Sequence, residues 1–221
     1  VVHGHMDVGS FVVDGLGERW RMDFGKQDYE SLESKGLRLF GRGQKSNRWQ
    51  VYRYNNLAHS TLAFDNTFQR ANGYAAINRF TNQPAFLSAM TDMTAVYKNA
   101  VDSAKREVAI VDQRYVVVKD EIVTNSTGST VRWAMVTPAE VRINEDGKAE
   151  LTQNGKKLQI QVTEPANVIL KTWSSQPSQD YDALNPGTTL VGFDVTLPPN
   201  TTQILNVLLM PEGITANEKT R

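Results

Sequence analysis

Short runs rich in Val, Ile, Phe, Tyr and Thr recur along the whole chain and are interrupted by Gly, Asn, Asp and Pro. Almost no stretch keeps a 3.6-residue periodicity. β-Branched and aromatic residues in short runs are typical of strands, and the interrupting residues are typical of turns. Residues 144–147 (Asn-Glu-Asp-Gly) and 154–155 (Asn-Gly) tolerate the positive φ angles of tight hairpins. The pattern therefore predicts many antiparallel strands joined by turns.

This strand content predicts an all-β fold, an antiparallel two-sheet β-sandwich of roughly a dozen or more strands with at most one or two short helices. Two stacked sheets are favoured because an open sheet would leave its faces and edges bare. The sandwich is expected to span residues 1–211, followed by a polar tail at 212–221. One helix is predicted at 27–34, and long surface loops at 35–47 and 174–187. Strands are predicted at 8–14, 19–24, 49–54, 61–65, 86–90, 107–111, 115–124, 131–137, 141–144, 149–152, 158–163, 167–172, 189–197 and 203–210.

The overall composition excludes several classes of protein. Lys and Arg number 24 against 24 Asp and Glu, which argues against a surface wholly devoted to nucleic acid or an anionic membrane. The chain has no cysteine, so disulfides, thiol nucleophiles and cysteine-type zinc sites are excluded. No apolar run approaches the roughly 18 to 20 residues of a membrane span. Because patterned sequence begins at once from Val1, we expect the chain to be part of a longer polypeptide.

All three histidines lie in the first part of the chain, at His3, His5 and His59. Alternation would place His3 and His5 on one face of an extended segment. Asp23 ends a predicted strand, and His59 precedes another. If these strands are neighbours, two imidazoles and one carboxylate could converge as ligands of zinc or another divalent ion. Ordinary surface or hydrogen-bonded histidines are the alternative interpretation.

Three segments near the N-terminus together carry a family resemblance. They are His3-Gly-His-Met-Asp-Val-Gly-Ser-Phe-Val-Val13, Met22-Asp-Phe-Gly25 and Asn56-Leu-Ala-His-Ser-Thr-Leu62, with a weaker echo in Arg114-Tyr-Val-Val-Val-Lys-Asp120. They resemble the C-terminal β-domain of the heparinase II/III-like polysaccharide lyases. The resemblance implies a structural metal, most often zinc, bound by His5, Asp23 and His59. Ser60 departs from the family, which usually has Asn there. Asp7 is either a hydrogen-bond acceptor for a ligand imidazole or a carboxylate at a strand edge.

The resemblance also implies a reaction, the β-elimination of a glycosidic bond to a uronic acid. In the family, an N-terminal α/α toroid supplies an Asn or His that neutralises the uronate carboxylate, and a Tyr that acts as acid and often base. That toroid is the expected partner domain, and it lies outside this chain. The β-domain lends a tyrosine and sometimes a histidine, for which Tyr29 and His3 are the candidates, with Tyr52 and Tyr54 as alternatives. Simple packing is the other interpretation of each tyrosine. A periplasmic or secreted location is implied as well.

The segment between Ser34 and Phe64 contains no acidic residue and six basic ones, Lys35, Arg38, Arg42, Lys45, Arg48 and Arg53. Aromatic residues are interleaved with them. Guanidinium groups suit carboxylates and sulfates, and aromatic faces suit sugar rings. Single-stranded nucleic acid uses similar ingredients, and a solvated loop is the plain alternative. With the histidines close by, an acidic polysaccharide is favoured over nucleic acid, and its predicted contacts are Arg42, Lys45, Arg48, Trp49, Tyr52 and Tyr54.

The leading hypothesis is therefore the metal-holding β-sandwich part of a polysaccharide lyase acting on a heparan sulfate-like or alginate-like substrate. Alone, the chain is expected to have little or no activity. A non-catalytic carbohydrate-binding β-sandwich is the second hypothesis. A purely structural or interaction sandwich, with neither metal nor glycan affinity, is the third.

Overall fold

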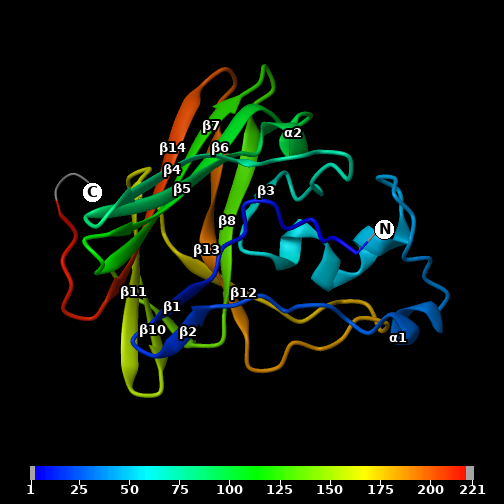
Figure 1. Ribbon diagram of the computed structural model, residues 1–221, viewed down its shortest axis with the longest axis horizontal. Helices are drawn as coiled ribbons and strands as arrows, with labels where there is room; N and C mark the ends of the chain where they lie inside the picture. The colour runs from blue at the N-terminus through cyan, green and yellow to red at the C-terminus, as the bar shows by residue number, and fades with distance from the viewer. Residues whose placement is uncertain (1–2, 218–221) are drawn as a thin grey trace.

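The computed structural model describes residues 3–217, which form two stacked antiparallel sheets (Figure 1). The all-β, two-sheet prediction is confirmed. The larger sheet has eight strands in the order β4 (Ile77–Gln83), β5 (Phe86–Asp92), β6 (Val101–Val111), β7 (Tyr115–Thr124), β14 (Thr202–Pro211), β11 (Lys156–Glu164), β10 (Ala149–Gln153) and β9 (Glu140–Ile143). The smaller sheet has four in the order β12 (Lys171–Ser174), β13 (Thr189–Leu197), β8 (Ser129–Thr137) and β3 (Leu62–Phe64). A separate hairpin joins β1 (Val13–Gly15) to β2 (Glu18–Arg21).

The helical elements of the described range are short. They are α1 (Tyr29–Glu33), α2 (Thr94–Tyr97) and three single 3₁₀ turns, η1 (Asn47–Gln50), η2 (Tyr52–Tyr54) and η3 (Asn56–Ala58). The α1 helix lies inside the predicted 27–34, and the Asp28 carboxylate caps it by accepting from the Ser31 N–H at 2.9 Å. Across residues 3–217, none of the helices has the length and apolar character that a bilayer crossing requires.

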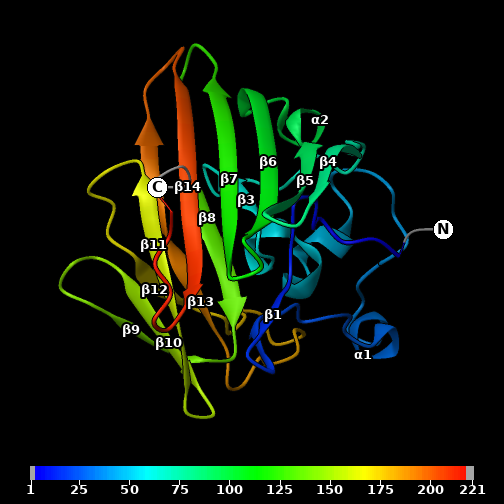
Figure 2. The same cartoon turned by 60° about the vertical axis from the view of Figure 1, so that its left-hand side comes forward.

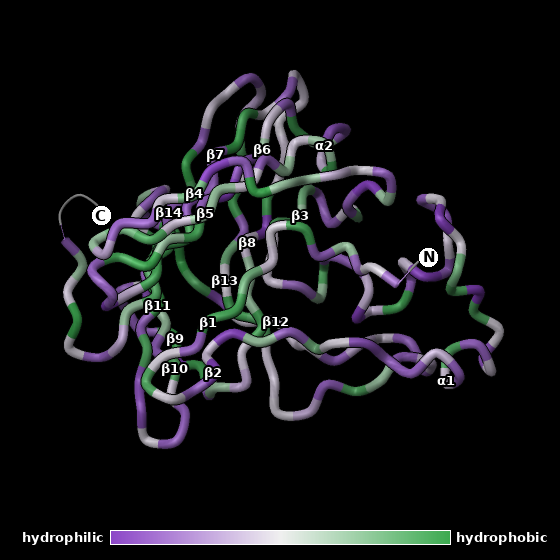
Figure 3. Tube along the Cα trace, viewed as in Figure 1, coloured by the Kyte–Doolittle hydropathy of each residue, from purple (hydrophilic) through white to green (hydrophobic). Residues whose placement is uncertain are grey.

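The main core lies between the two sheets. Trp133 of β8 and Phe193 of β13 are stacked, with ring centroids 5.9 Å apart, on the inner face of the smaller sheet. Val118 of β7 and Leu205 of β14 belong to the same buried cluster from the larger sheet. Because strand side chains alternate between faces, each sheet contributes one apolar face to this core. Figure 3 shows the apolar positions recurring along these strands.

The N-terminal part of the chain lies largely outside the sandwich, beside one end of it (Figure 2). It contains α1 and the 3₁₀ turns and has its own apolar cluster, in which Leu32, Leu39, Val51 and Tyr54 are buried. The 174–187 loop reaches this layer, where Tyr181 packs against the cluster. Irregular chain can sit here because side chains satisfy its backbone groups. This layer carries most of the residues singled out from the sequence.

Three of the strand predictions need correction, and one strand was not predicted. Residues 49–54 are the turns η1 and η2, because the Ser46 side chain accepts from the Arg48 N–H and the Asn55 side chain donates to the Trp49 and Val51 carbonyls, which closes the chain locally. Within 8–14, the strand is limited to the start of β1. The 167–172 strand is shifted to β12. β4 was missed because it is an exposed edge strand without apolar alternation.

The polar tail, residues 212–221, is ordered over its described part. Ala216 is buried and Ile214 packs beside it, against a cluster on β6, β7 and β14 that includes Tyr115 and Leu208. Residues 212–217 are therefore part of the folded unit, and 218–221 lie outside the described residues.

The hairpin predicted at residues 154–155 is confirmed, with φ angles of 49° at Asn154 and 73° at Gly155.

The pairing of β13 with β8 requires a glycine at position 192. A Cβ built there would lie 2.0 Å from the Trp133 carbonyl oxygen and 2.8 Å from the Ala134 Cα. Substitution Gly192→Ala is expected to lower the free energy of unfolding by roughly 1 to 3 kcal/mol or more, because the two strands must separate locally. Urea denaturation measures this change. Gly15→Ala is the control, since its nearest contact is at 3.9 Å and it should change little.

Candidate functional site

Two histidines and an aspartate converge beside the end of the smaller sheet. One ligand atom from each of His5, Asp23 and His59 lies within 4.8 Å of the other two. His5 comes from the N-terminal segment, Asp23 follows β2, and His59 follows η3. The structure thus brings together the three residues predicted as metal ligands.

The Asp23 carboxylate contacts both its own turn and the His59 ring. One carboxylate oxygen accepts from the Gly25 N–H at 2.8 Å, and the other lies 2.7 Å from His59 Nδ1. Gly25 has a φ of +66°, which is why a glycine follows two residues after the aspartate. Burial would raise the pKa of Asp23, but the hydrogen bond and charge of His59 outweigh it and hold the pKa below its usual range. Asp23 is therefore a carboxylate at neutral pH.

His5 lies against His59 and Tyr54. Its ring centroid is 5.4 Å from that of His59 and 4.6 Å from that of Tyr54. Burial, followed by the nearby His59, lowers the pKa of His5 to about 4. At neutral pH its imidazole is uncharged and keeps a lone pair free for a ligand bond.

The buried ring of His59 fits a metal ligand. Its Nε2 atom is buried and has no hydrogen-bond partner among the described residues. Leaving such an atom unsatisfied is costly, and a bound cation would satisfy the site. Ligand atoms of a tetrahedral zinc ion lie roughly 3.4 Å apart, so the three side chains would have to move closer together to bind one ion. The donor set therefore fits zinc, with a fourth position open.

His3 and Tyr29 form a second pair close to this group. His3 Nδ1 is 3.1 Å from the Tyr29 hydroxyl, and the two rings are stacked with centroids 5.8 Å apart. Phe40 meets both rings edge-on. His3 is exposed and is not one of the three grouped metal candidates. The two residues predicted as catalytic thus contact each other directly.

Arg48 links the His3–Tyr29 pair to the histidine group. Its Nε donates to the Gly4 carbonyl at 2.9 Å, between His3 and His5, and its Nη2 donates to the Tyr29 hydroxyl at 3.4 Å. The guanidinium also lies 4.5 Å from the Tyr54 ring centroid. Arg48 is fully buried and forms no ion pair among the described residues. Its positive charge is thus directed at the Tyr29 oxygen.

The residues predicted to contact substrate do not form one surface. Arg42 and Lys45 are exposed, and Tyr52 is half-buried. Arg48, Trp49 and Tyr54 are buried, and direct substrate contact by these three stays a prediction. The Trp49 indole N–H donates to the Gly43 carbonyl, and the Tyr54 hydroxyl donates to the Gln27 carbonyl. They pack the layer that supports the site.

A buried ion pair that sequence reasoning missed fastens the site to the larger sheet. Arg106 of β6 makes two hydrogen bonds to Asp120 of β7, at 2.7 and 2.9 Å, and both residues are almost fully buried. Arg106 Nη1 also donates to the carbonyls of Gly9 and Ser60, at 2.9 and 3.1 Å. One guanidinium thereby holds the segment after His5 and the residue after His59. The Arg114–Asp120 segment, part of the family resemblance, includes Asp120, but nothing in it indicates that Arg106 is the partner of this aspartate.

Ser60 and Asp7, which neighbour the histidines in sequence, make different kinds of contact. The Ser60 hydroxyl accepts from the Val136 N–H at 3.0 Å, so it secures the chain to β8. The Asp7 carboxylate is exposed and makes no hydrogen bond to a described residue, while its carbonyl accepts from the Ser10 N–H. Asp7 therefore accepts no hydrogen bond from a described imidazole, and it precedes β1 rather than lying at a strand edge. Gln69 and Thr61 both donate to the Val8 carbonyl, so they also hold the segment that follows His5.

Comparison with known proteins identifies the family. The family model described as "Heparinase II/III-like, C-terminal" matches residues 1–215. The chain belongs to the heparinase II/III-like C-terminal family. No curated protein sequence matches it. The solved structure of the heparan sulfate lyase HepC from Pedobacter heparinus has a TM-score of 0.71 at 15% identity and covers 98% of this chain and 32% of its own.

A heparinase III gene product gives a similar structural match. Its TM-score is 0.72 at 19% identity, and the alignment covers 99% of this chain and 34% of that one. A further heparinase III crystal structure matches with a TM-score of 0.70 at 14% identity, over 99% of this chain and 31% of that one. The heparinase II/III-like domain thus shares the fold of these proteins and spans about a third of their length.

The buried ion pair predicts a large and specific loss of stability. Asp120→Asn is expected to lower the free energy of unfolding by about 3 to 5 kcal/mol, because it leaves the Arg106 guanidinium uncompensated. Replacing both residues, as Arg106→Met with Asp120→Leu, should cost less. Urea denaturation compares them. Asp194→Asn in the exposed Lys171–Asp194 pair is the control and should cost below about 1 kcal/mol.

Proposed function

We propose that this heparinase II/III-like domain is the C-terminal part of a polysaccharide lyase that cleaves uronic-acid-containing acidic polysaccharide by β-elimination. The observation that carries the proposal is the Tyr29 hydroxyl, which lies 3.1 Å from His3 Nδ1 and accepts from Arg48. Family membership supports the reaction class. The partner domain would be an N-terminal α/α toroid of the same polypeptide, and the location periplasmic or secreted.

β-Elimination breaks the C5–H bond and the C4–O bond of a uronate and forms a C4–C5 double bond. It requires a base for the C5 proton, an acid for the departing oxygen, and charge stabilisation at the carboxylate. A Tyr29 phenolate would be stabilised by the Arg48 guanidinium, so Tyr29 can take the proton. The resulting phenol can return it to the leaving oxygen. His3 would orient the hydroxyl through its hydrogen bond.

We also propose that His5, Asp23 and His59 bind zinc with a structural role. A bound zinc ion would crosslink three segments that lie outside the sheets and are far apart in sequence. The neutral His5, the ionised Asp23 and the unpartnered Nε2 of His59 support this ligand set. His5 is two residues from His3, so the crosslink would also fix the backbone that presents His3 to Tyr29.

The zinc proposal is tested by metal analysis of the purified 221-residue chain. About one zinc per chain is expected, and removal by a chelator should lower Tm by several degrees because zinc binds the folded state. His59→Ala should abolish zinc binding. His3→Ala is the matched control and should retain it, since His3 is outside the ligand group. A chain free of divalent metal with an unchanged Tm after chelation contradicts the proposal.

The catalytic proposal is tested in the polypeptide that carries this domain. Tyr29→Phe is expected to lower kcat about 10²- to 10⁴-fold with little change in KM, because it removes the proton-transfer group and keeps the ring. The ultraviolet absorbance of the unsaturated product is the measurement. Tyr74→Phe is the control, because Tyr74 is 76% exposed and belongs neither to the metal candidates nor to the His3–Tyr29 pair. A kcat within about twofold of the parent would remove Tyr29 from the mechanism.

A non-catalytic carbohydrate-binding module is the second candidate. The exposed Arg42 and Lys45 on the basic 35–47 loop favour it. The same assays separate the two candidates, since glycan binding without unsaturated product supports the module. Product formation that depends on Tyr29 supports the lyase.

A further inference from the structure

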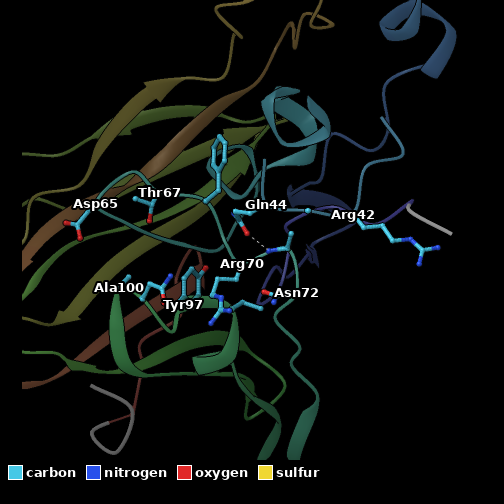
Figure 4. Close-up of a pocket in the computed structure, with 13 residues that line it drawn as sticks. Arg42, Gln44, Asp65, Thr67, Arg70, Asn72, Tyr97 and Ala100 are labelled. Carbon is cyan, nitrogen blue, oxygen red and sulfur yellow. Dashed lines mark hydrogen bonds between the residues drawn. The ribbon is translucent and has the colours of Figure 1, made fainter. Parts of the chain in front are cut away.

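A pocket lined by both polar and apolar groups lies apart from the histidine group, none of whose residues line it. It has a volume of about 580 Å³ and is formed by the 42–44 loop, the 65–72 segment and the chain around α2. Figure 4 shows Arg70 among the lining residues, between Tyr97 and Asn72, while the Arg42 side chain extends outward at the rim. Pockets of about 300–1,000 Å³ accommodate small ligands. This volume suits a short stretch of a sugar chain.

The pocket presents an unneutralised positive charge. Arg70 forms no ion pair or side-chain hydrogen bond with a described residue, although it is half-buried. The carboxylate on the wall, Asp65, is engaged by the Ser129 hydroxyl and the Thr130 N–H, both at 2.8 Å. In Figure 4 Asp65 lies at the far side of the pocket from Arg70. Arg70 is thus available to an anion from outside the chain.

The other lining groups match the remaining surfaces of a sugar. The side-chain amides of Asn72 and Asn99 have no hydrogen-bond partner among the described residues, so they can bind hydroxyl groups. Phe68 is 37% exposed on the same wall and offers an apolar ring face. An acidic sugar has an anionic group, hydroxyls and an apolar ring face, which correspond to these three kinds of contact.

The backbone of the pocket is held in place before any ligand binds. Gln44 accepts from the Ala71 N–H at 2.7 Å, drawn dashed in Figure 4, and donates to the Gln69 carbonyl at 2.9 Å. The Arg70 N–H donates to the Val96 carbonyl at 2.9 Å. Gly73 approaches Val96 so closely that a Cβ would lie 2.6 Å from its side chain. Such preorganisation lowers the entropic cost of binding.

From these contacts we propose that the pocket around Arg70, Phe68, Asn72 and Asn99 is a binding subsite for an acidic sugar residue. The Arg70 guanidinium pairs with its carboxylate or sulfate in a bidentate manner. The subsite rests on the proposed function for its ligand class. It is built from residues other than Tyr29, His3 and the three metal candidates, so it would hold the polysaccharide away from the bond being cleaved.

The test is isothermal titration calorimetry of the 221-residue chain with a heparan sulfate tetrasaccharide and an unsulfated tetrasaccharide of the same backbone. Arg70→Gln is expected to weaken binding about tenfold or more, the effect of losing charge-assisted hydrogen bonds. Phe68→Ala should also weaken it. Arg142→Gln is the matched control, because Arg142 is an exposed arginine on β9, outside the pocket. It should leave affinity within about twofold.

The outcomes separate the subsite from the proposed function. If Arg70→Gln weakens binding of both oligosaccharides, Arg70 pairs with the carboxylate. If it weakens binding of the sulfated oligosaccharide alone, Arg70 pairs with sulfate. No binding by the parent chain, or equal losses in Arg70→Gln and Arg142→Gln, overturns the subsite. Tighter binding of single-stranded DNA of equal charge would overturn it as a sugar site. Zinc content and product formation are measured separately, so the proposed function can survive failure of the subsite.

Discussion

The Arg106–Asp120 ion pair is the interaction on which the site depends. A guanidinium buried between two sheets and an irregular layer must be paired and fully hydrogen-bonded, or it would destabilise the fold. Asp120 pairs with it in a bidentate manner, and the Arg106 Nη1 group donates to the carbonyls of Gly9 and Ser60. The pair lies on adjacent strands of the larger sheet. The paired strands of the larger sheet therefore hold the two segments that carry His5 and His59.

The layer outside the sandwich is organised mainly by side chains that bind backbone groups. Arg48 donates to the Gly4 carbonyl, Tyr54 to that of Gln27, and Gln69 to that of Val8. Chain without regular strands must satisfy its polar groups in this way when it is buried. The consequence is that several polar and aromatic residues near the site are structural. Buried Arg48 is both a structural residue and a residue of the site, because it donates to the Gly4 carbonyl and also to the Tyr29 hydroxyl.

The regular strands of the sandwich were predicted closely, whereas the N-terminal layer was not. β7 and β13 have the bounds expected from their apolar patterns. The 49–54 segment shows a similar local pattern but forms 3₁₀ turns, because no strand lies alongside to pair with it and nearby side chains satisfy its backbone. The local pattern likewise does not distinguish buried Arg48 from exposed Arg42 and Lys45. Periodicity reports which faces are apolar, and it does not report what covers them.

By itself, the sequence determined the all-β class and most strands of the two sheets, and it predicted the grouping of His5, Asp23 and His59, because strand periodicity and short motifs are local properties. The tertiary structure alone decided which basic residues are buried, that His3 pairs with Tyr29, and that Arg106 joins Asp120 to the chain beside the histidines. It also decided that the Arg70 side chain has no partner among residues 3–217, in a pocket made by three separate segments. Burial and charge pairing depend on contacts between distant parts of the chain, and no local pattern encodes them.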